Sequence, residues 1–223
     1  ATISDSALEA NTASQEGGGL YNAGTTILNR SAVISNMATL PGGGIWTDAG
    51  LTLVNSTVSG NQAGATAAGI YVETTGQITA TNATIAANSG PGWGIYKAGE
   101  ATLQNTIVAD HANGNCLAVA TPFNSLGHNL SSDNSCDGLT AGGDMVDTDP
   151  MLGMLQDNGG PTLTQALLEG SPAIDAGDDA ACAAPPVGGV DQRGIERPFL
   201  DACDIGAYEF EMWRIYLPLV ARH

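Results

Sequence analysis

Apolar and polar residues alternate along short stretches of this chain. The segment LTLVNSTVSGN, from Leu51 to Asn61, alternates in this way, is rich in Thr and Val, and ends in Gly and Asn. This pattern is typical of a β-strand followed by a turn. No window of the chain has the 3.6-residue periodicity of an amphipathic helix. The pattern therefore predicts an all-β protein built from short strands.

The same pattern returns at intervals of about 25 residues. Each repeat starts with a glycine followed by an aliphatic and an aromatic residue, and these starts are Gly19, Gly44, Gly69 and Gly94. Three further sets of positions share the spacing: the aromatic residues Tyr21, Trp46, Tyr71 and Tyr96, the aliphatic residues Leu28, Leu53, Ile78 and Leu103, and the asparagines Asn11, Asn36 and Asn61. His111 continues the asparagine set two periods later.

Three short strands in each period are typical of one coil of a right-handed parallel β-helix. Successive coils stack at about 4.8 Å, so equivalent side chains form ladders, with aliphatic residues inside and asparagines hydrogen-bonded along a turn. In the third repeat the asparagine falls at Asn88, which we explain by two residues inserted between Ile78 and Ile85 and compensated before Gly94. The sequence therefore predicts a right-handed parallel β-helix.

The regular repeats occupy residues 1–112, and the pattern fades from Asn113 onwards. Residues 113–210 are interpreted as a less regular closing region of the β-helix, and residues 211–223 as an apolar tail. Acidic residues follow a similar division, with seven in residues 1–110 and sixteen in residues 133–211. Because the first coil starts partway through, at Ala1, we expect it to expose an uncapped edge.

A net charge of −17, from 6 Lys and Arg against 23 Asp and Glu, makes the surface strongly acidic. Such a surface repels the phosphate backbone of nucleic acids and disfavours anionic membranes. The most apolar run, MWRIYLPLVA, contains Arg214 and Pro218 and is too short to span a bilayer. The chain shows no signal peptide, so we expect the mature form. We predict no nucleic-acid partner, no membrane insertion and no cofactor.

Four cysteines lie in the second half of the chain, at Cys116, Cys136, Cys182 and Cys203. None has the close pairing of a zinc site or a redox motif. An even number of widely spaced cysteines predicts two disulfides and a location outside the cytoplasm. Three connectivities are open, and we favour the two that join sequence neighbours, Cys116–Cys136 and Cys182–Cys203.

Five motifs follow one another in the second half: NGNCLAV, SLGHNLSSDNSC, DTDPMLGMLQDNGGPTLTQALLEGSPAIDAG, DQRGIERP and CDIGAYEF. Together they resemble the C-terminal region of bacterial secreted β-helix proteins of the choice-of-anchor type, which are related to polymorphic outer-membrane repeat proteins. The resemblance implies a right-handed parallel β-helix, export, and a cell-surface or extracellular location in a bacterium. It implies adhesion or surface structure rather than a known reaction.

The apolar tail fits no repeat position and resembles the short C-terminal tails that serve in sorting or anchoring in some of these proteins. One interpretation adds the tail as an extra strand to its own β-helix. We favour a second interpretation, in which it pairs as a donor strand with the uncapped first coil of the next molecule. Repeated head-to-tail contacts then build a filament. The predicted interface consists of Ile3, Leu8, Trp213, Ile215, Tyr216, Leu217, Leu219 and Val220.

An enzymatic or sugar-binding function is the alternative. Asp48 and Glu73 are one period apart, which places them on neighbouring coils beside Trp46 and Tyr71. Two carboxylates about 5 Å apart next to aromatic rings suit a retaining glycosidase. The next coil has Ala98 at this position, however, and stacked carboxylates also occur on solvated faces. The aromatic ladder is a candidate sugar-binding stripe, although stacked rings also stabilise a rod face or form lateral contacts.

Two acidic segments are candidate calcium sites, because calcium prefers several oxygen ligands. Their carboxylates are Asp144, Asp147, Asp149, Asp175, Asp178 and Asp179. Neither segment matches an EF-hand or a calcium-binding nonapeptide, so we favour solvated acidic loops. His111 and His128 are interpreted as structural. The N-glycosylation patterns NRS, NST, NAT and NLS coincide with asparagines that the ladders and turns already require.

These patterns favour a non-enzymatic structural protein of the bacterial cell surface or extracellular space that binds copies of itself. The alternative is a surface adhesin, or a β-helix that binds or cleaves polysaccharides, with cell-surface glycans as partners.

Overall fold

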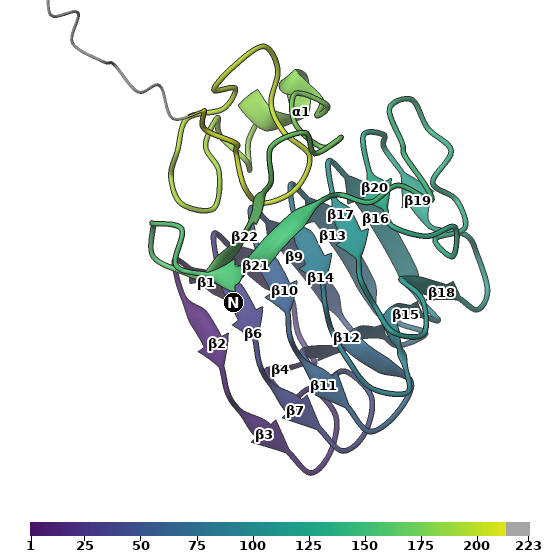
Figure 1. Cartoon of the computed structure of the whole chain (residues 1–223). Helices are drawn as coiled ribbons and strands as arrows, with labels where there is room; N and C mark the ends of the chain where they lie inside the picture. The colour runs from purple at the N-terminus through teal and green to yellow at the C-terminus, as the bar shows by residue number, and fades with distance from the viewer. Residues whose placement is uncertain (213–223) are drawn as a thin grey trace, which may run out of the picture.

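A computed structural model describes residues 1–212 and shows four stacks of parallel strands, with the chain winding from one stack to the next (Figure 1). Sheet A contains β1 (Thr2–Ser4), β5 (Thr26–Asn29), β9 (Gly50–Val54), β13 (Gln77–Thr81), β16 (Glu100–Gln104) and β19 (Asn124–Ser125). Sheet B contains β2 (Ala7–Glu9), β6 (Ala32–Ile34), β10 (Thr57–Ser59), β14 (Thr84–Ala86), β17 (Ile107–Ala109) and β20 (Leu130–Ser131). Sheet C contains β3 (Thr12–Ala13), β7 (Met37–Ala38) and β11 (Gln62–Ala63). Sheet D contains β4 (Leu20–Asn22), β8 (Ile45–Thr47), β12 (Ala67–Val72), β15 (Trp93–Lys97) and β18 (Cys116–Ala118).

The pairing between coils follows the predicted period. Strands β5 and β9 place Leu28 beside Leu53, and strands β4 and β8 place Tyr21 beside Trp46, so that each residue lies next to its equivalent one period along the chain. Every strand pair in the four sheets is parallel. The predicted parallel β-helix, with coils of about 25 residues, is therefore confirmed.

The core is a set of aliphatic ladders that run along the inside of the stack. Leu28, Ile45 and Leu53 are completely buried, because each inward side chain lies between its equivalents in the coils on both sides. One continuous apolar cluster extends from Ile3 in the first coil to Phe123 in the last. This continuity explains why short strands suffice, since each coil shares its core with two neighbours.

The asparagine ladder is present as predicted. The side-chain amide of Asn11 donates to Oδ1 of Asn36 at 3.0 Å, Asn36 donates to Asn61 at 3.0 Å, and Asn61 donates to Asn88 at 2.8 Å. His111 takes the next position, with its Nε2 atom 3.1 Å from the Asn88 amide nitrogen. The ladder therefore joins five coils.

One detail of the predicted register is wrong. Strands β9 and β13 pair Ile78 with Leu51 and Ala80 with Leu53. Ala80 therefore occupies the ladder position that the sequence pattern assigned to Ile78. The two extra residues lie in the turn between β12 and β13 rather than between Ile78 and Ile85, because the offset to the preceding coil grows by two positions across that turn. A solvent-exposed turn absorbs an insertion at a lower cost than a paired strand.

The C-terminal end of the core is closed by side chains of the last coil. Cys116 and Cys136 form a disulfide there, as predicted. Phe123 and Leu139 are buried against the same end of the core cluster. The coil stack itself continues as far as β20.

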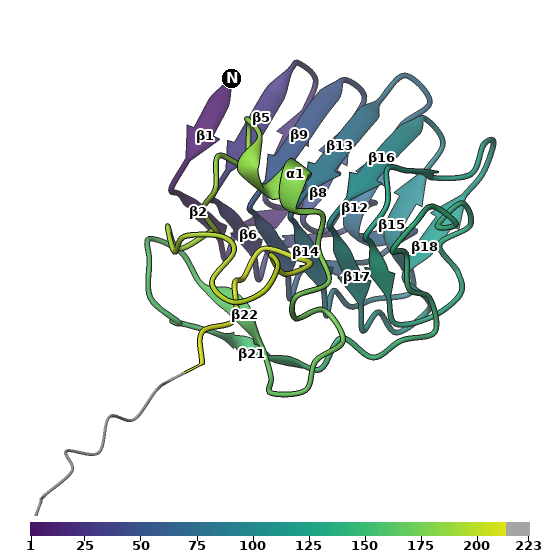
Figure 2. The ribbon, with the colours of Figure 1, turned by 90° about the horizontal axis from the view of Figure 1, so that it is seen from above.

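Residues 150–212, called the docked segment below, run back along the outside of sheet B (Figures 1 and 2). They contain the antiparallel pair β21 (Leu152–Gln156) and β22 (Thr164–Leu167) and the helix α1 (Asp179–Ala183). Leu167 and Ile205 of this segment share a second apolar cluster with Ile107 of the stack. The predicted disulfide Cys182–Cys203 ties the helix to the end of the segment.

Candidate functional site

The first coil presents an edge of unpaired strands. Within residues 1–212, each of β1, β2, β3 and β4 pairs with another strand on one side only. We call these four strands the N-terminal edge. An edge of this kind leaves a row of backbone N–H and C=O groups available for another strand.

The N-terminal edge also exposes part of the core. Ile3, Leu8 and Leu20 are partly exposed, although they pack against the core cluster. Their equivalents one coil further on, Leu28 and Val33 among them, are almost completely buried. At the opposite end β18, β19 and β20 also pair with a strand on one side only, but that end is covered by residues 133–145, by the Cys116–Cys136 disulfide and by the buried side chains of Phe123 and Leu139. The two ends of the coil stack therefore differ.

The structure locates two residues of the predicted self-association interface. Ile3 and Leu8 lie on the N-terminal edge as expected. The tail residues of the prediction lie outside the described residues: Trp213, Ile215, Tyr216, Leu217, Leu219 and Val220. The predicted contact between the two groups therefore stays a prediction.

The aromatic ladder lies on the outside of sheet D. The rings of Tyr21 and Trp46 stack with centroids 4.4 Å apart, and those of Tyr71 and Tyr96 stack at 4.8 Å. Stacked rings cover one another's faces, so these faces are not free to receive a sugar ring. Trp46 is only 9% exposed, whereas Tyr21 at the end of the ladder is 55% exposed. The geometry favours a stabilising role for the ladder.

Asp48 and Glu73 lie next to each other on successive coils, as predicted. Val72 pairs with Thr47, and the backbone N–H of Glu73 donates to the carbonyl of Thr47, so the next residues along the two strands, Asp48 and Glu73, are neighbours. Both are partly exposed, and the Glu73 carboxylate accepts the backbone N–H of Thr74 at 2.9 Å. Burial and the neighbouring Glu73 charge raise the pKa of Tyr71. A glycosidase acid needs an environment that holds its proton at neutral pH, such as an apolar pocket. The open position of this pair favours solvated carboxylates.

Several of the candidate calcium ligands accept hydrogen bonds from nearby protein groups instead. The Asp144 carboxylate accepts from Ser125 Oγ and from the backbone N–H of Asn129, at 2.6 and 2.9 Å. Asp178 caps α1, and Asp175 accepts backbone N–H groups after Pro198. In residues 1–212, no three Asp, Glu, His or Cys side chains converge to hold a metal ion. Asp147, Asp149 and Asp179 belong to no such group either.

A buried ionic cluster forms where the motifs DQRGIERP and CDIGAYEF meet, and the sequence pattern did not identify it. Arg197 bonds to Glu209 at 3.1 Å, and both side chains are almost completely buried. Burial, followed by the charge of Glu209, raises the pKa of Asp204 to about 7. Burial likewise raises the pKa of Glu209 and lowers that of Arg197. Arg residues are scarce in this chain, and two of them within five positions in DQRGIER were the available signal.

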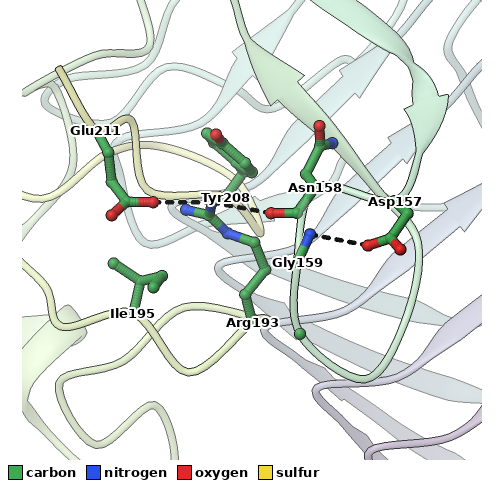
Figure 3. A pocket seen from close by; sticks show the side chains of 8 residues that line it. Asp157, Asn158, Gly159, Arg193, Ile195, Tyr208 and Glu211 are labelled. Carbon is green, nitrogen blue, oxygen red and sulfur yellow. Dashed lines mark hydrogen bonds and ion pairs between the residues drawn. The ribbon is translucent and has the colours of Figure 1, made fainter. Parts of the chain in front are cut away.

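Beside this cluster lies a cavity of about 520 Å³, shown in Figure 3. Arg193 is one of its lining residues and stacks on Tyr208, with the guanidinium 3.7 Å from the ring centroid. The same guanidinium bonds to Asp191 at 2.8 Å and to Glu211 at 3.0 Å. Its charge is therefore already balanced by two carboxylates. The cavity accordingly has no free cationic group among its lining residues for an anionic ligand.

A second row of asparagines holds the docked segment against the stack. The side-chain amides of Asn55, Asn82 and Asn105 donate to the carbonyl oxygens of Val187, Asp204 and Asp178, at 3.4, 3.5 and 3.3 Å. These three asparagines have positive φ angles, a conformation that asparagine tolerates better than most residues. Asn55 and Asn82 also start two of the glycosylation patterns, and both are completely buried. Their role in the folded protein is structural.

No known protein family, curated protein or solved structure matches this chain. Within residues 1–212, no helix has the length and apolar character needed to cross a membrane. The two disulfides indicate a non-cytoplasmic environment.

Proposed function

We propose that this chain is a non-enzymatic structural protein of the bacterial cell surface or extracellular space, and that it binds a second copy of itself through the N-terminal edge. The observation that carries this proposal is the difference between the two ends of the stack. One end is closed by the Cys116–Cys136 disulfide, whereas the other exposes unpaired strands over a partly open core.

An added strand offers the N-terminal edge two kinds of stabilisation. Backbone hydrogen bonds would continue the ladder of each sheet, as in β-strand addition between proteins. Burial of Ile3, Leu8 and Leu20 would contribute about 25 cal/mol for each Å² of apolar surface removed from water. A strand with alternating apolar residues supplies both, because its inward side chains would extend the aliphatic ladders.

The tail of a second copy is the partner strand that we favour. Residues 211–223 are the most apolar stretch of the sequence and lie beyond the last element of the docked segment. At the opposite end, β18, β19 and β20 also pair with a strand on one side only, but residues 133–145 are hydrogen-bonded against that end, so we place the tail against the N-terminal edge of another molecule. A tail that reaches from one molecule to the next gives a heterologous contact, and such contacts build open filaments when the rotation does not close.

Sedimentation velocity across a concentration series tests this proposal. The full chain is compared with Leu8→Lys, which puts a charge on the N-terminal edge, and with a chain that lacks residues 211–223. Leu126→Lys is the matched control, because Leu126 is 53% exposed and lies at the opposite end of the stack. We expect concentration-dependent assembly of the full chain and of the control, and monomers for the other two.

Two outcomes would contradict the proposal in different ways. A full chain that stays monomeric at every concentration, or a Leu8→Lys variant that assembles normally, would exclude the N-terminal edge as an interface. If the full chain and the truncated chain both assembled and the Leu8→Lys variant did not, the N-terminal edge would remain the interface but the tail would not be its partner. In that case the N-terminal edges of two molecules would pair with each other.

A further inference from the structure

A short motif recurs in the strands of sheet D, a leucine or isoleucine directly followed by tyrosine or tryptophan. Strand β4 begins with Leu20 and Tyr21, and β8, β12 and β15 contain the same motif. Parallel pairing places each motif beside the next along the sheet. Among the strands of the four sheets, which all lie within residues 1–212, aromatic residues occur in sheet D alone. The motif is therefore specific to this sheet.

The two residues of the motif lie in different environments. Ile45, Ile70 and Ile95 are completely buried in the core, whereas the aromatic rings form the ladder on the outer face. This difference follows from the alternation of side chains along a strand. A further strand of sheet D needs the same two residues in the same order, one to extend the core and one to extend the aromatic ladder.

Strand β4 leaves both rows of side chains open at one end. Leu20 is only partly buried, although it packs against the core cluster. The ring of Tyr21 stacks on Trp46 on one side, but the residue is 55% exposed, because β4 pairs with β8 alone. The open side of β4 can therefore receive one aliphatic and one aromatic side chain.

The backbone of β4 also has hydrogen-bonding groups on this side. The N–H of Leu20 donates to the carbonyl of Gly44 in the next coil. The carbonyl of Asn22 accepts from the N–H of Asp48 in the same coil. Successive residues of a strand direct their backbone groups to opposite sides, so the N–H and C=O of Tyr21 point away from β8, as expected for an edge strand.

The tail contains the motif of sheet D. Residues 214–217 read RIYL, and residues 94–97, from the start of the fourth repeat, read GIYK. In the whole sequence, a leucine or isoleucine directly before a tyrosine or tryptophan occurs in the four motifs of sheet D and once more, at Ile215 and Tyr216. Residues 213–223 lie beyond those that the structure describes. They are long enough for one strand of sheet D, because β4 has 3 residues and β12 has 6.

We infer that residues 214–217 of a second copy add to β4 as a parallel strand of sheet D, an inference that rests on the proposed self-association. In this register Ile215 lies beside Leu20 at the open end of the core, and Tyr216 stacks on the uncovered face of Tyr21. The other strands of the N-terminal edge fit the tail less well, because β1, β2 and β3 hold no aromatic residue to receive Tyr216.

The backbone groups fit the same register. By equivalence with the pairing of β4 and β8, the N–H of Tyr21 donates to the carbonyl of Ile215, and its own carbonyl accepts from the N–H of Leu217. Pro218 follows and has no N–H to donate. Its position faces away from β4, so no hydrogen bond to β4 is lost, and proline is tolerated in an edge strand for this reason.

One position of the tail departs from the repeats, because Arg214 stands where each repeat has a glycine. A Cβ atom on Gly19 would lie 2.7 Å from the Asn36 side chain and 2.8 Å from that of Val33, and both residues follow Gly19 in the same coil. A single added strand brings no such coil with it. The contacts that exclude a side chain at Gly19 are therefore absent at Arg214.

Sedimentation equilibrium tests this register with the full chain and with Tyr21→Ala, Tyr216→Ala and the double variant. Each single change removes one ring of the stack and should weaken self-association by about tenfold. The double variant should be no weaker than either single one, because the second change then removes nothing further. Tyr96→Ala is the matched control, because it removes a stacked ring at the other end of the ladder. It should associate like the original chain, and circular dichroism should show that all variants are folded.

The possible results separate this register from the proposed function. If the original chain assembled and both single variants assembled equally well, the contact between Tyr21 and Tyr216 would be excluded while self-association stood. Effects that add up in the double variant would also exclude it, because they would show that the two rings act independently. An equal loss in Tyr96→Ala would assign the effect to the ladder as a whole. An original chain that stayed monomeric at every concentration would overturn both the proposed function and this inference.

Discussion

At the residue scale, His111 shows how the ladder accommodates a titratable group. Its ring is buried between Asn88 and Asn115, with a ring nitrogen 3.1 Å from each side chain. Burial, which outweighs the opposing effects of Asn115 and Asp133, lowers the pKa of His111 to about 4. The ring is therefore neutral at pH 7. In the unfolded chain the His111 side chain has its ordinary pKa of 6.5 and therefore binds a proton more readily.

This difference predicts a loss of stability in acid. The contribution of His111 is fully present above pH 6.5 and is lost as the pH falls towards 4, by on the order of 3 kcal/mol in total. His111→Asn should remove this dependence, because asparagine is the residue of the ladder and does not titrate. The measurement is urea unfolding between pH 4 and pH 7, with the free energy of the variant compared with that of the original chain.

The free energy of unfolding of His111→Asn must be compared with that of the original chain, because Asp204 changes the stability of both with pH in the opposite direction. Its raised pKa, about 7, gives a contribution that is fully present below the ordinary pKa of 3.8 and is lost as the pH rises through 7. This contribution is common to both chains and cancels in the difference. If the free-energy difference between them did not change with pH, His111 would not be the buried neutral group described here.

At the scale of the elements, the ladder explains why every repeat begins with glycine. A Cβ atom on Gly69 would lie 2.5 Å from the carbonyl oxygen of Gly94 and 3.0 Å from Nδ2 of Asn88. Gly44 faces Asn61 in the same way. The strands of sheet D therefore pass so close to the asparagine ladder that they leave no space for a side chain at this position.

Gly69→Ala should accordingly destabilise the protein by about 1–3 kcal/mol, because the backbone oxygen that it meets cannot move away without disturbing the next coil. Gly50→Ala is the control, since its added Cβ would meet nothing closer than 3.8 Å. That change should be nearly neutral, within about 0.5 kcal/mol. Both are measured by urea unfolding at one pH. Equal effects at the two positions would mean that close packing does not explain the repeated glycine.

The register error at Ile78 shows what the sequence pattern can and cannot decide. Side chains alternate along a strand, so a shift of two residues keeps the same face inward. Leu51 and Leu53 both face the core, and either is an acceptable partner for Ile78. The period and the ladders were predictable because they depend on residues at fixed spacing, whereas the cysteine pairs were a choice among three connectivities that the structure confirms. The course of the docked segment was not predictable, because Asn55 and Asn105 find their partners far along the chain, at sequence separations of 132 and 73.

At the scale of the whole molecule, the two disulfides hold different parts of the structure. They close loops of nearly equal length, with sequence separations of 20 and 21 residues. Cys116–Cys136 closes the end of the core beside Phe123. Cys182–Cys203 holds the docked segment at the asparagine row, where Asn82 and Asn105 both donate to the Cys182 sulfur at 3.3 Å. The loss of chain entropy is therefore similar for the two bonds, but the structures that depend on them differ.

Replacing either cysteine pair by serine should destabilise the protein by about 3 kcal/mol, since loops of this length give similar entropies of closure. Hydrogen exchange should separate the two variants. Without Cys182–Cys203, amides of the docked segment such as Gly177 and Cys182 should lose protection, whereas strands of the stack keep theirs. Without Cys116–Cys136, the loss should instead fall on β18 and the adjoining end of sheet D. Identical patterns of exchange would show that the stack and the docked segment open as one unit, so that neither disulfide acts locally.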